Sequence, residues 1–220
     1  MKTINFNNNK FQISRDGILY WFDKQIAIIS DLHLEKGSSF GPSGQFLPPY
    51  DSEETLTKLL HTISKYNITK VILLGDTFHD KNALNRMSNK VLILFEIFIK
   101  KYEVIFVLGN HETKMQLENI KFFNEYVLDG IHFIHQTSKK SIYQISGHYH
   151  PVATIRTGSK KITGKCFIQE QYNLIMPSYG VFTGGLNIKN KIFKKIFKKE
   201  PNVYFLGKRS VYKFPYKFYL

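Results

Sequence analysis

The sequence has almost no cysteine, with Cys166 as the single one among 220 residues. A disulfide within the chain is therefore excluded, and so is a zinc site built from several cysteine thiolates. Proteins without disulfides are typical of reducing compartments, and we expect this one to be cytoplasmic.

Long hydrophobic segments are also missing. The longest apolar run, residues 91–99, is interrupted by Glu96 and is far shorter than the roughly 20 residues that a membrane-spanning helix needs. Residues 1–10 contain no apolar stretch of the kind that a secretory signal requires, and we expect no membrane partner. Because 43% of the residues are hydrophobic, the chain can bury a core without cross-links, and we expect a single domain over residues 1–220.

Acidic residues are scarce relative to basic ones. The chain has 31 lysines and arginines against 17 aspartates and glutamates, a net charge of +14. Residues 186–220 hold ten of the basic residues and only Glu200 on the acidic side, so +9 of the +14 lies there. A field of this sign attracts polyanions such as nucleic acid. Only four of the basic residues are arginines, however, and abundant lysine, isoleucine and asparagine is also what an AT-rich genome encodes, so both explanations stay open.

Continuous apolar runs occur at residues 25–30, 70–74 and 104–108. Strands that are buried on both faces have this pattern, as in parallel or mixed sheets covered by helices. Amphipathic helices are predicted at residues 52–66, where Ser52 can act as the N-cap, and at residues 88–101. After residue 131 the sequence predicts mainly strands, with one short basic helix between residues 188 and 197.

Polar residues follow five apolar runs at the same place, where each run ends. Ligand-binding residues in α/β sheets tend to lie just beyond the carboxyl ends of strands. One histidine at such a place is usually an ordinary core or surface residue, but five coincidences of this kind are hard to attribute to chance. The runs end in Asp31 and His33, in Asp76, in Asn110 and His111, in His135, and in His148 and His150.

This set of side chains favours divalent metal binding. Carboxylate, carboxamide and imidazole groups together suit manganese, iron or zinc better than magnesium or calcium alone. One residue separates Asp31 from His33 and His148 from His150, and on an extended segment residues i and i+2 project to the same side. A single aspartate shared between two cations can hold them about 3.5–4 Å apart, the separation typical of two-metal hydrolases.

The same residues, read in order, resemble the motif set of the calcineurin-like metallophosphoesterases. The match spans most of the chain and keeps the order and spacing of the family. The motifs are Asp31-x-His33, Gly75-Asp76, Gly109-Asn110-His111-Glu112, His135 and Gly147-His148-x-His150. Residues 31–40 (DLHLEKGSSF), 46–51 (FLPPYD), 75–80 (GDTFHD), 147–151 (GHYHP) and 177–187 (PSYGVFTGGLN) further resemble the bacterial ligase-associated DNA damage response endonucleases.

The resemblance implies a four-layer α/β/β/α sandwich, with two mixed sheets flanked by helices and a dinuclear site at the sheet edges. It implies two divalent cations bridged by Asp76, with manganese expected and iron or zinc as alternatives. His135 is preferred as a ligand over His132 because it ends its strand. Carried over residue by residue, the first metal has the ligands Asp31, His33, Asp76 and His150, and the second has Asp76, Asn110, His135 and His148.

The family pattern also implies a role for His111, which is not a ligand and would face the leaving group. The expected catalytic residues are therefore His111 and the bridging Asp76. The residue after His111 is Glu112, where the family usually has aspartate. Several nearby residues could contact the substrate or orient the ligands, although an ordinary surface position is an equally good interpretation for them: Lys36, Ser38, His79, Asp80 and Glu112.

The expected reaction is hydrolysis of a phosphodiester in DNA during damage response, by attack of a metal-bridging hydroxide on phosphorus. Two alternatives stay open. The same metal core serves phosphomonoesterases and pyrophosphatases that act on a nucleotide or another small phosphorylated metabolite. A member that had lost catalysis could bind protein or nucleic acid instead, although such members lose metal ligands and this sequence keeps them all. No oligomeric state is predicted.

Overall fold

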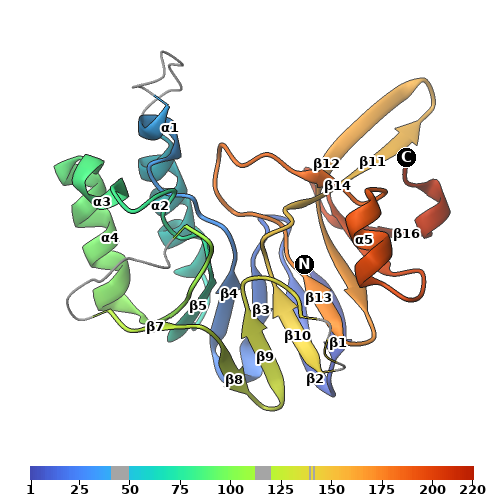
Figure 1. Ribbon diagram of the computed structural model, residues 1–220, viewed down its shortest axis with the longest axis horizontal. Helices are drawn as coiled ribbons and strands as arrows, with labels where there is room; N and C mark the ends of the chain where they lie inside the picture. Colours follow the sequence, from blue (N-terminus) through green and yellow to red (C-terminus); the bar gives the residue numbers. More distant parts are fainter. Residues whose placement is uncertain (41–49, 112–119, 139, 141) are drawn as a thin grey trace.

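Two β-sheets pack face to face in the centre of the fold, and helices cover their outer faces (Figure 1). The computed structural model describes residues 1–40, 50–111, 120–138, 140 and 142–220. Helices α1 to α4 lie beside the first sheet, and α5 lies beside the second (Figure 1). The predicted α/β class and the four-layer α/β/β/α sandwich are confirmed.

The first sheet has the strand order β1-β2-β3-β4-β5-β6-β7. Strands β1 to β4 pair antiparallel, and β4 to β7 pair parallel. The predicted continuous apolar runs are the parallel strands β4, β5 and β6, which the sheet buries at its centre. The strands are β1 Lys2–Phe6, β2 Asn9–Ile13, β3 Leu19–Trp21, β4 Ile26–Ile29, β5 Lys70–Leu74, β6 Glu103–Val107 and β7 Phe122–Phe123.

The N-terminal hairpin of this sheet was not among the predicted elements. Strands β1 and β2 are joined by Asn7 and Asn8, whose φ angles are 47° and 59°. The type I′ hairpin turn needs positive φ at both of its central positions, and asparagine tolerates that conformation. The Asn-Asn pair between two alternating segments is therefore the local signal that predicts this hairpin.

The second sheet has the strand order β14-β11-β12-β13-β10-β9-β8, with β15 paired to β12 and β16 paired to β15. Strand β10 lies parallel to both of its neighbours, β9 and β13. The strands predicted after residue 131 are present here. They are β8 Tyr126–Leu128, β9 Ile131–Ile134, β10 Tyr143–Ser146, β11 Pro151–Thr157, β12 Lys160–Glu170, β13 Asn173–Ile175, β14 Leu186–Asn187, β15 Asn202–Leu206 and β16 Val211–Phe214.

Three apolar clusters hold the layers together. The central cluster lies between the sheets and joins Trp21 and Ile72 of the first sheet to Phe133 and Phe167 of the second. The cluster between the first sheet and its helices includes Leu59 of α2. The cluster beneath α5 contains Phe193. Burial of this apolar surface fixes the two sheets against each other, and so fixes the strand ends that carry the polar residues.

The predicted first helix forms, but its predicted cap does not. Helix α2 spans Asp51–Ile63 and begins after Tyr50, without a side-chain cap. The Ser52 hydroxyl instead accepts a hydrogen bond from the Glu35 backbone N–H at 2.6 Å. Helix α4 spans Asn89–Lys101, and the Ser88 hydroxyl caps it by accepting from Val91 N at 3.3 Å. The short elements are α1 Lys36–Ser39, α3 Ala83–Arg86, α5 Lys191–Ile196, and the 3-10 turns η1 Phe22–Lys24 and η3 Tyr216–Phe218.

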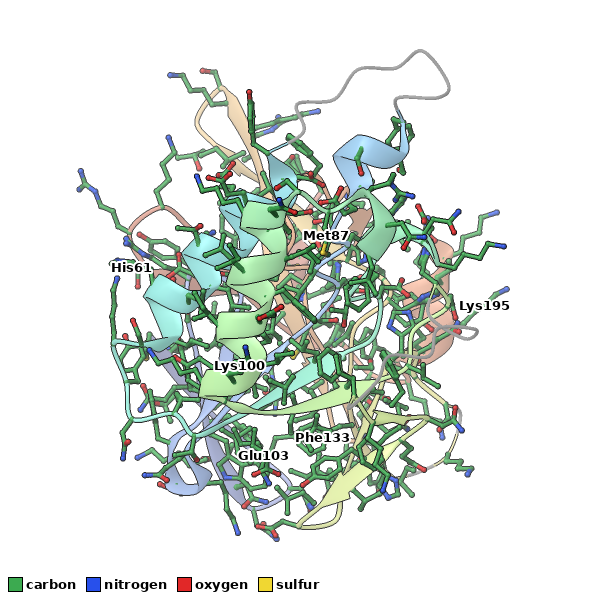
Figure 2. All side chains as sticks on the ribbon, turned by 90° about the vertical axis from the view of Figure 1, so that its left-hand side faces the viewer. His61, Met87, Lys100, Glu103, Phe133 and Lys195 are labelled. Carbon is green, nitrogen blue, oxygen red and sulfur yellow. The ribbon has the colours of Figure 1, made fainter. Side chains whose placement is uncertain are left out.

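Figure 2 looks onto the helical layer of the first sheet, with α4 in front and Lys100 near its C-terminal end. His61 of α2 is exposed at the side of this layer, so it takes no part in the histidine-rich strand ends (Figure 2). None of the described helices combines the length and the apolar character that crossing a lipid bilayer requires.

Candidate metal centre

The polar residues singled out in the sequence converge at one edge of the two sheets. Asp31 follows β4 by two residues, Asp76 follows β5 by two, and His135 comes directly after β9. His148 and His150 lie in the short connection between β10 and β11. Because β4 and β5 are parallel neighbours, as are β9 and β10, their carboxyl ends meet at the same edge.

The backbone at these positions differs from the predicted extended alternation. Asp31 and His33 have φ angles of 52° and 46°, and His148 and His150 have 69° and 44°. Asp76 also has a positive φ, 46°. Left-handed conformations are unusual for residues with a side chain and concentrate at functional sites. Asp31 and His33 therefore share one ligand group from coiled backbone, while His148 and His150 belong to two different groups, and the expectation of extended segments is wrong.

Backbone hydrogen bonds fix two of these turns against each other. Asp31 N donates to Gly75 O at 3.3 Å, and His33 N donates to Asp76 O at 2.8 Å. These bonds extend the pairing of β4 and β5 beyond the ends of the strands. They hold the first two polar turns in register, so their side chains project into a common space.

One group of possible metal ligands contains Asp31, His33 and His150. Asp31 Oδ1 lies 3.2 Å from His150 Nε2, and His33 Nε2 lies 3.3 Å from the same nitrogen. Asp31 and His33 are buried, and His150 is half-buried. Two imidazole nitrogens and a carboxylate oxygen at such distances form a mixed nitrogen and oxygen donor set of the kind that transition metals prefer.

A second group contains Asp76, His135 and His148. Asp76 Oδ2 lies 3.4 Å from His135 Nε2, and His148 Nδ1 lies 3.1 Å from that nitrogen. Asn110 is adjacent, with its Nδ2 placed 3.2 Å from His148 Nδ1. The amide orientation is interchangeable, so the Asn110 oxygen can occupy the same position as a neutral donor.

Asp76 lies between the two groups. Its Oδ2 is 3.8 Å from His33 Nε2 on one side and 3.4 Å from His135 Nε2 on the other. His33, Asp76 and His111 form a third set of three whose donor atoms are mutually close. The residues therefore fit two neighbouring divalent cations that share one carboxylate.

Hydrogen bonding at the back of His135 determines which of its nitrogens faces the cluster. His135 Nδ1 lies 3.0 Å from the backbone oxygen of Leu74, which can only accept, so Nδ1 carries the proton. Its Nε2 is then free to act as a ligand, an arrangement typical of metal-binding histidines. His132, the alternative considered from the sequence, contacts Glu125 on the outer side of the sheet instead. The structure brings His135, and not His132, into the cluster.

A proton on His135 offsets part of the negative charge that Asp31 and Asp76 carry in this cluster. Burial alone would raise the pKa of Asp31, but the hydrogen bond and charge of His150 hold it below its ordinary value. Burial would lower the pKa of His135, but the hydrogen bond to Asp76 and the charges of Asp76 and Asp31 raise it to about 9. Burial lowers the pKa of His33 to about 3. The carboxylates therefore attract positive charge, which a metal ion would supply in place of that proton.

His111 lies at the open side of the cluster. Its side chain is 39% exposed, whereas Asp76 beside it is almost fully buried. The His111 backbone N–H donates to Asp76 Oδ1 at 3.2 Å, which fixes the start of this loop. His79 stacks on the His111 ring with centroids 5.3 Å apart. Burial, with the charges of His111 and Lys36, lowers the pKa of His79. The two rings thus line the same face of the cluster.

Asp80 and Ser38 belong to a supporting network rather than to the cluster itself. Arg86 Nη2 pairs with Asp80 Oδ2 at 2.6 Å, and Arg86 Nε donates to Ser38 Oγ at 3.0 Å. Lys36 begins α1 next to this network and is half-buried. Glu112 lies outside the described residues. Arg86 was not predicted, because its partners are 6 and 48 residues away and no local pattern marks them.

A second support, also not predicted, packs against the first polar turn. Lys165 Nζ donates to Ser178 O at 2.8 Å and to Gly180 O at 3.1 Å. In the same segment, Gly180 N donates to Asp31 O at 3.1 Å. A side chain at Gly180 would place its Cβ 2.1 Å from Leu32 O, so glycine permits this close approach. Lys165 therefore holds the segment that covers the backbone of Asp31.

The cluster leaves no room for a side chain at Gly147. A Cβ there would lie 1.7 Å from Ser30 Oγ and 2.3 Å from Asp31 Oδ2. Ser30 Oγ itself donates to Asp31 Oδ2, and His148 N donates to the same carboxylate oxygen at 3.1 Å. The glycine before His148 thus lets the backbone of one sheet approach a carboxylate of the other.

Known proteins share the fold and the sequence pattern of this chain. The structure of the Pseudomonas putida nuclease MPE superposes with a TM-score of 0.74 at 20% sequence identity, covering 97% of this chain and 99% of that one. Yfce, a phosphoesterase from E. coli, gives a TM-score of 0.43 at 14% identity, covering 86% of this chain and 98% of that one. No sequence match was found among curated proteins. The family model of the calcineurin-like phosphoesterases matches residues 24–217, and the chain belongs to that family.

Proposed function

We propose that this protein is a two-metal phosphodiesterase that cleaves DNA, as the ligase-associated damage-response endonucleases do. The observation that carries the proposal is the position of Asp76 between two sets of metal-ligand groups. Membership of the calcineurin-like phosphoesterase family supports a metal-dependent phosphoester hydrolase. Manganese is the proposed metal, because the donor set mixes imidazole with carboxylate.

The ligands divide between the two cations as the groups indicate. Asp31, His33 and His150 would hold the first, and His135, His148 and Asn110 the second, with Asp76 shared. Two cations held there would supply Lewis acidity at phosphorus and would lower the pKa of a bound water. The buried ligands fix this geometry before the substrate arrives, because the turns that carry them are hydrogen-bonded to each other.

His111 is proposed to protonate the departing oxygen. It is the most exposed histidine of the third group, so a substrate can reach its ring. Its backbone is fixed to Asp76, and His79 stacks against its ring. A proton placed at the leaving oxygen is worth roughly 10²–10⁴ in rate. His79 is proposed to orient His111 on the face where the substrate binds.

DNA is the proposed substrate for two reasons. MPE from Pseudomonas putida is a nuclease, and this chain shares its fold over nearly the full length of both proteins. The chain also carries a net charge of +14, which attracts a polyanion. A panel of single-stranded DNA, double-stranded DNA, a small phosphodiester and its monoester, each assayed with manganese, tests the proposal. Cleavage of DNA that weakens steeply with salt would support it. Hydrolysis of monoesters alone would identify a phosphomonoesterase and overturn it.

Metal binding is expected to release a proton from His135. The neighbouring carboxylates raise the pKa of His135 to about 9, so near neutral pH its imidazole is protonated in the metal-free protein. A metal ligand must be unprotonated, so the metal affinity should rise as the pH rises toward 9. Titration calorimetry with manganese in two buffers of different ionisation enthalpy measures the proton release. An affinity that is independent of pH between about pH 6.5 and 8 would contradict this assignment.

An alanine at Gly147 is expected to weaken manganese binding by about 10–100-fold, the range seen when the surroundings of a metal ligand are disturbed. The added methyl group would displace the Asp31 carboxylate, which lies 2.3 Å from its position. Gly184→Ala is the matched control, because a Cβ there meets no atom within 4 Å. Calorimetric manganese titration of both variants provides the measurement. Equal affinities for Gly147→Ala and the wild type would show that Asp31 does not need this close approach.

A further inference from the structure

A hollow of about 450 Å³ opens directly beside the metal centre, on the side of α5. Two of the proposed metal ligands form one wall of it, and residues of β14 and α5 form the other. Its volume is in the range of sites that bind small organic groups. The lining includes Gln136, His148, Tyr149, His150, Leu186 and Ile192.

The hollow lies away from the proposed leaving-group side. Among the described residues, His111 is not part of its lining. The ring of His111 instead contacts His33 and His79, which belong to the loops after β4 and β5. A phosphate at the metals would therefore direct its departing oxygen toward His111. The substituent that stays on phosphorus would point toward the hollow.

The lining combines a fixed aromatic ring with apolar side chains. The Tyr149 ring packs on Phe193 of α5, with centroids 5.9 Å apart. Its hydroxyl lies 3.2 Å from Thr137 Oγ1 and 3.4 Å from Gln136 Nε2. These contacts hold the Tyr149 ring in place, so the ring loses little conformational freedom when a planar group binds against it. Gln136 adds an amide that can both donate and accept hydrogen bonds.

Helix α5 provides positive charge around an exposed apolar residue. Ile192 is 42% exposed although it borders the centre of a polar site. Lys191, Lys194 and Lys195 on the same helix are exposed, and no acidic residue occurs within α5. An apolar surface beside lysines matches a ligand that has a flat apolar base and neighbouring phosphates. Binding of single-stranded nucleic acids uses this combination.

We propose that the hollow seats the nucleobase of the nucleotide that retains the phosphate after cleavage. This proposal rests on the proposed phosphodiesterase function and adds to it a binding site for the base of the substrate. Ile192 and Tyr149 contact the base, Gln136 reads its polar edge, and the lysines of α5 contact the next phosphate of the strand. Helix α5, in addition to covering the second sheet, then sets the preference for nucleotide over other phosphodiesters.

The test compares three substrates that share one leaving group. The 5′ and 3′ isomers of thymidine p-nitrophenyl phosphate and methyl p-nitrophenyl phosphate all release p-nitrophenolate and differ only in the group that stays on phosphorus. In the wild type with manganese, kcat/KM is expected to be about tenfold higher for one of the thymidine esters, from contacts of the size of base stacking. Equal values for the thymidine and methyl esters would overturn the proposal.

Variants then locate the preference. Ile192→Asp is expected to lower the ratio of kcat/KM between the thymidine and methyl esters by about tenfold, because it removes the apolar contact with the base, whereas its repulsion of the phosphate acts on both esters alike. Ile97→Ala is the control, since Ile97 is similarly exposed, at 46%, on α4 at the other side of the molecule. A ratio that Ile192→Asp leaves unchanged would overturn the proposal and assign the hollow to another partner. If neither ester is hydrolysed in a metal-dependent way, the proposed function itself fails, which is a different result.

A binding measurement gives a readout that does not depend on turnover. The thymidine monophosphate that corresponds to the preferred ester, 5′ or 3′, and inorganic phosphate are titrated separately into the wild type and Ile192→Asp with manganese present. The nucleotide should bind the wild type more tightly than phosphate does, and the variant should bind both equally. A nucleotide advantage that persists in Ile192→Asp would contradict the placement of the base in this hollow.

Discussion

An Asp76→Asn protein is expected to lose phosphodiester hydrolysis by about 10³-fold or more and to bind fewer than two metal ions per chain. The Asp76 Oδ2 atom lies 3.4 Å from His135 Nε2 and 3.8 Å from both His33 Nε2 and His111 Nε2. Asparagine keeps the shape of the side chain but removes the charge on which both ligand groups depend. The initial rate on a small phosphodiester and the bound manganese per chain are measured in the same preparation.

The control for Asp76→Asn is Glu53→Gln, which removes an acidic charge from the surface ion pair with Lys90 on the helical layer. Glu53→Gln should retain the wild-type rate and metal content. Thermal unfolding of both variants in the presence of a chelator shows whether each protein is folded. A folded Asp76→Asn protein that still binds two manganese ions and hydrolyses the substrate at the wild-type rate would remove Asp76 from the centre of the account.

A His111→Ala protein is expected to lose DNA cleavage by roughly 10²–10⁴-fold while it still binds two metal ions. DNA has a poor leaving oxygen that needs a proton, whereas p-nitrophenolate leaves readily without one. Hydrolysis of a p-nitrophenyl phosphodiester should therefore fall much less than DNA cleavage does. The exposed His111 ring makes this selective loss possible, because its removal leaves the buried ligands in place.

His61→Ala is the matched control for His111→Ala, because His61 is an exposed histidine on the outer side of α2. It should change neither substrate. His79→Ala should give a weaker form of the same selective loss, since His79 stacks against His111. If His111→Ala slows the two substrates equally, then His111 does not supply the leaving-group proton.

The strand ends could be predicted from the sequence because at each one polar residues directly follow an apolar run. A central strand that is buried on both faces has an apolar sequence, and the chain becomes polar where it leaves the sheet. For Asp31, Asp76 and His135, these local signals were enough to place the side chains at one edge. The resemblance to the family supplied the division into two metal sites, which no local pattern contains.

The backbone conformation of the site could not be predicted from the same signals. Asp31 and His33 have positive φ in a turn whose backbone N–H groups donate to Gly75 O and Asp76 O, in the segment that follows β5. The i, i+2 spacing therefore gave the right proximity for the wrong reason. Ser52 shows the same limit: its position predicts a helix cap, but its hydroxyl accepts a hydrogen bond from the backbone N–H of Glu35, the residue before α1.

Long-range supports were not predicted at all. Arg86 of α3 reaches Ser38 of α1 and Asp80, and Lys165 reaches the segment that covers Asp31. Each of these contacts depends on how distant segments pack together. In a sequence with many basic residues, nothing local distinguishes the lysine or arginine that will make such a contact. The hollow beside α5 belongs to the same class, because its walls come from β14, α5 and the two turns after β9 and β10.

The most direct test of the two-metal account is a titration of the metal-free protein with manganese, in which bound metal and the rate of phosphodiester hydrolysis are recorded together. Hydrolysis is expected to be absent in the chelated protein and to reach its maximum only when two manganese ions are bound per chain. Full activity in the presence of chelator, or a maximum at one bound ion per chain, would contradict it.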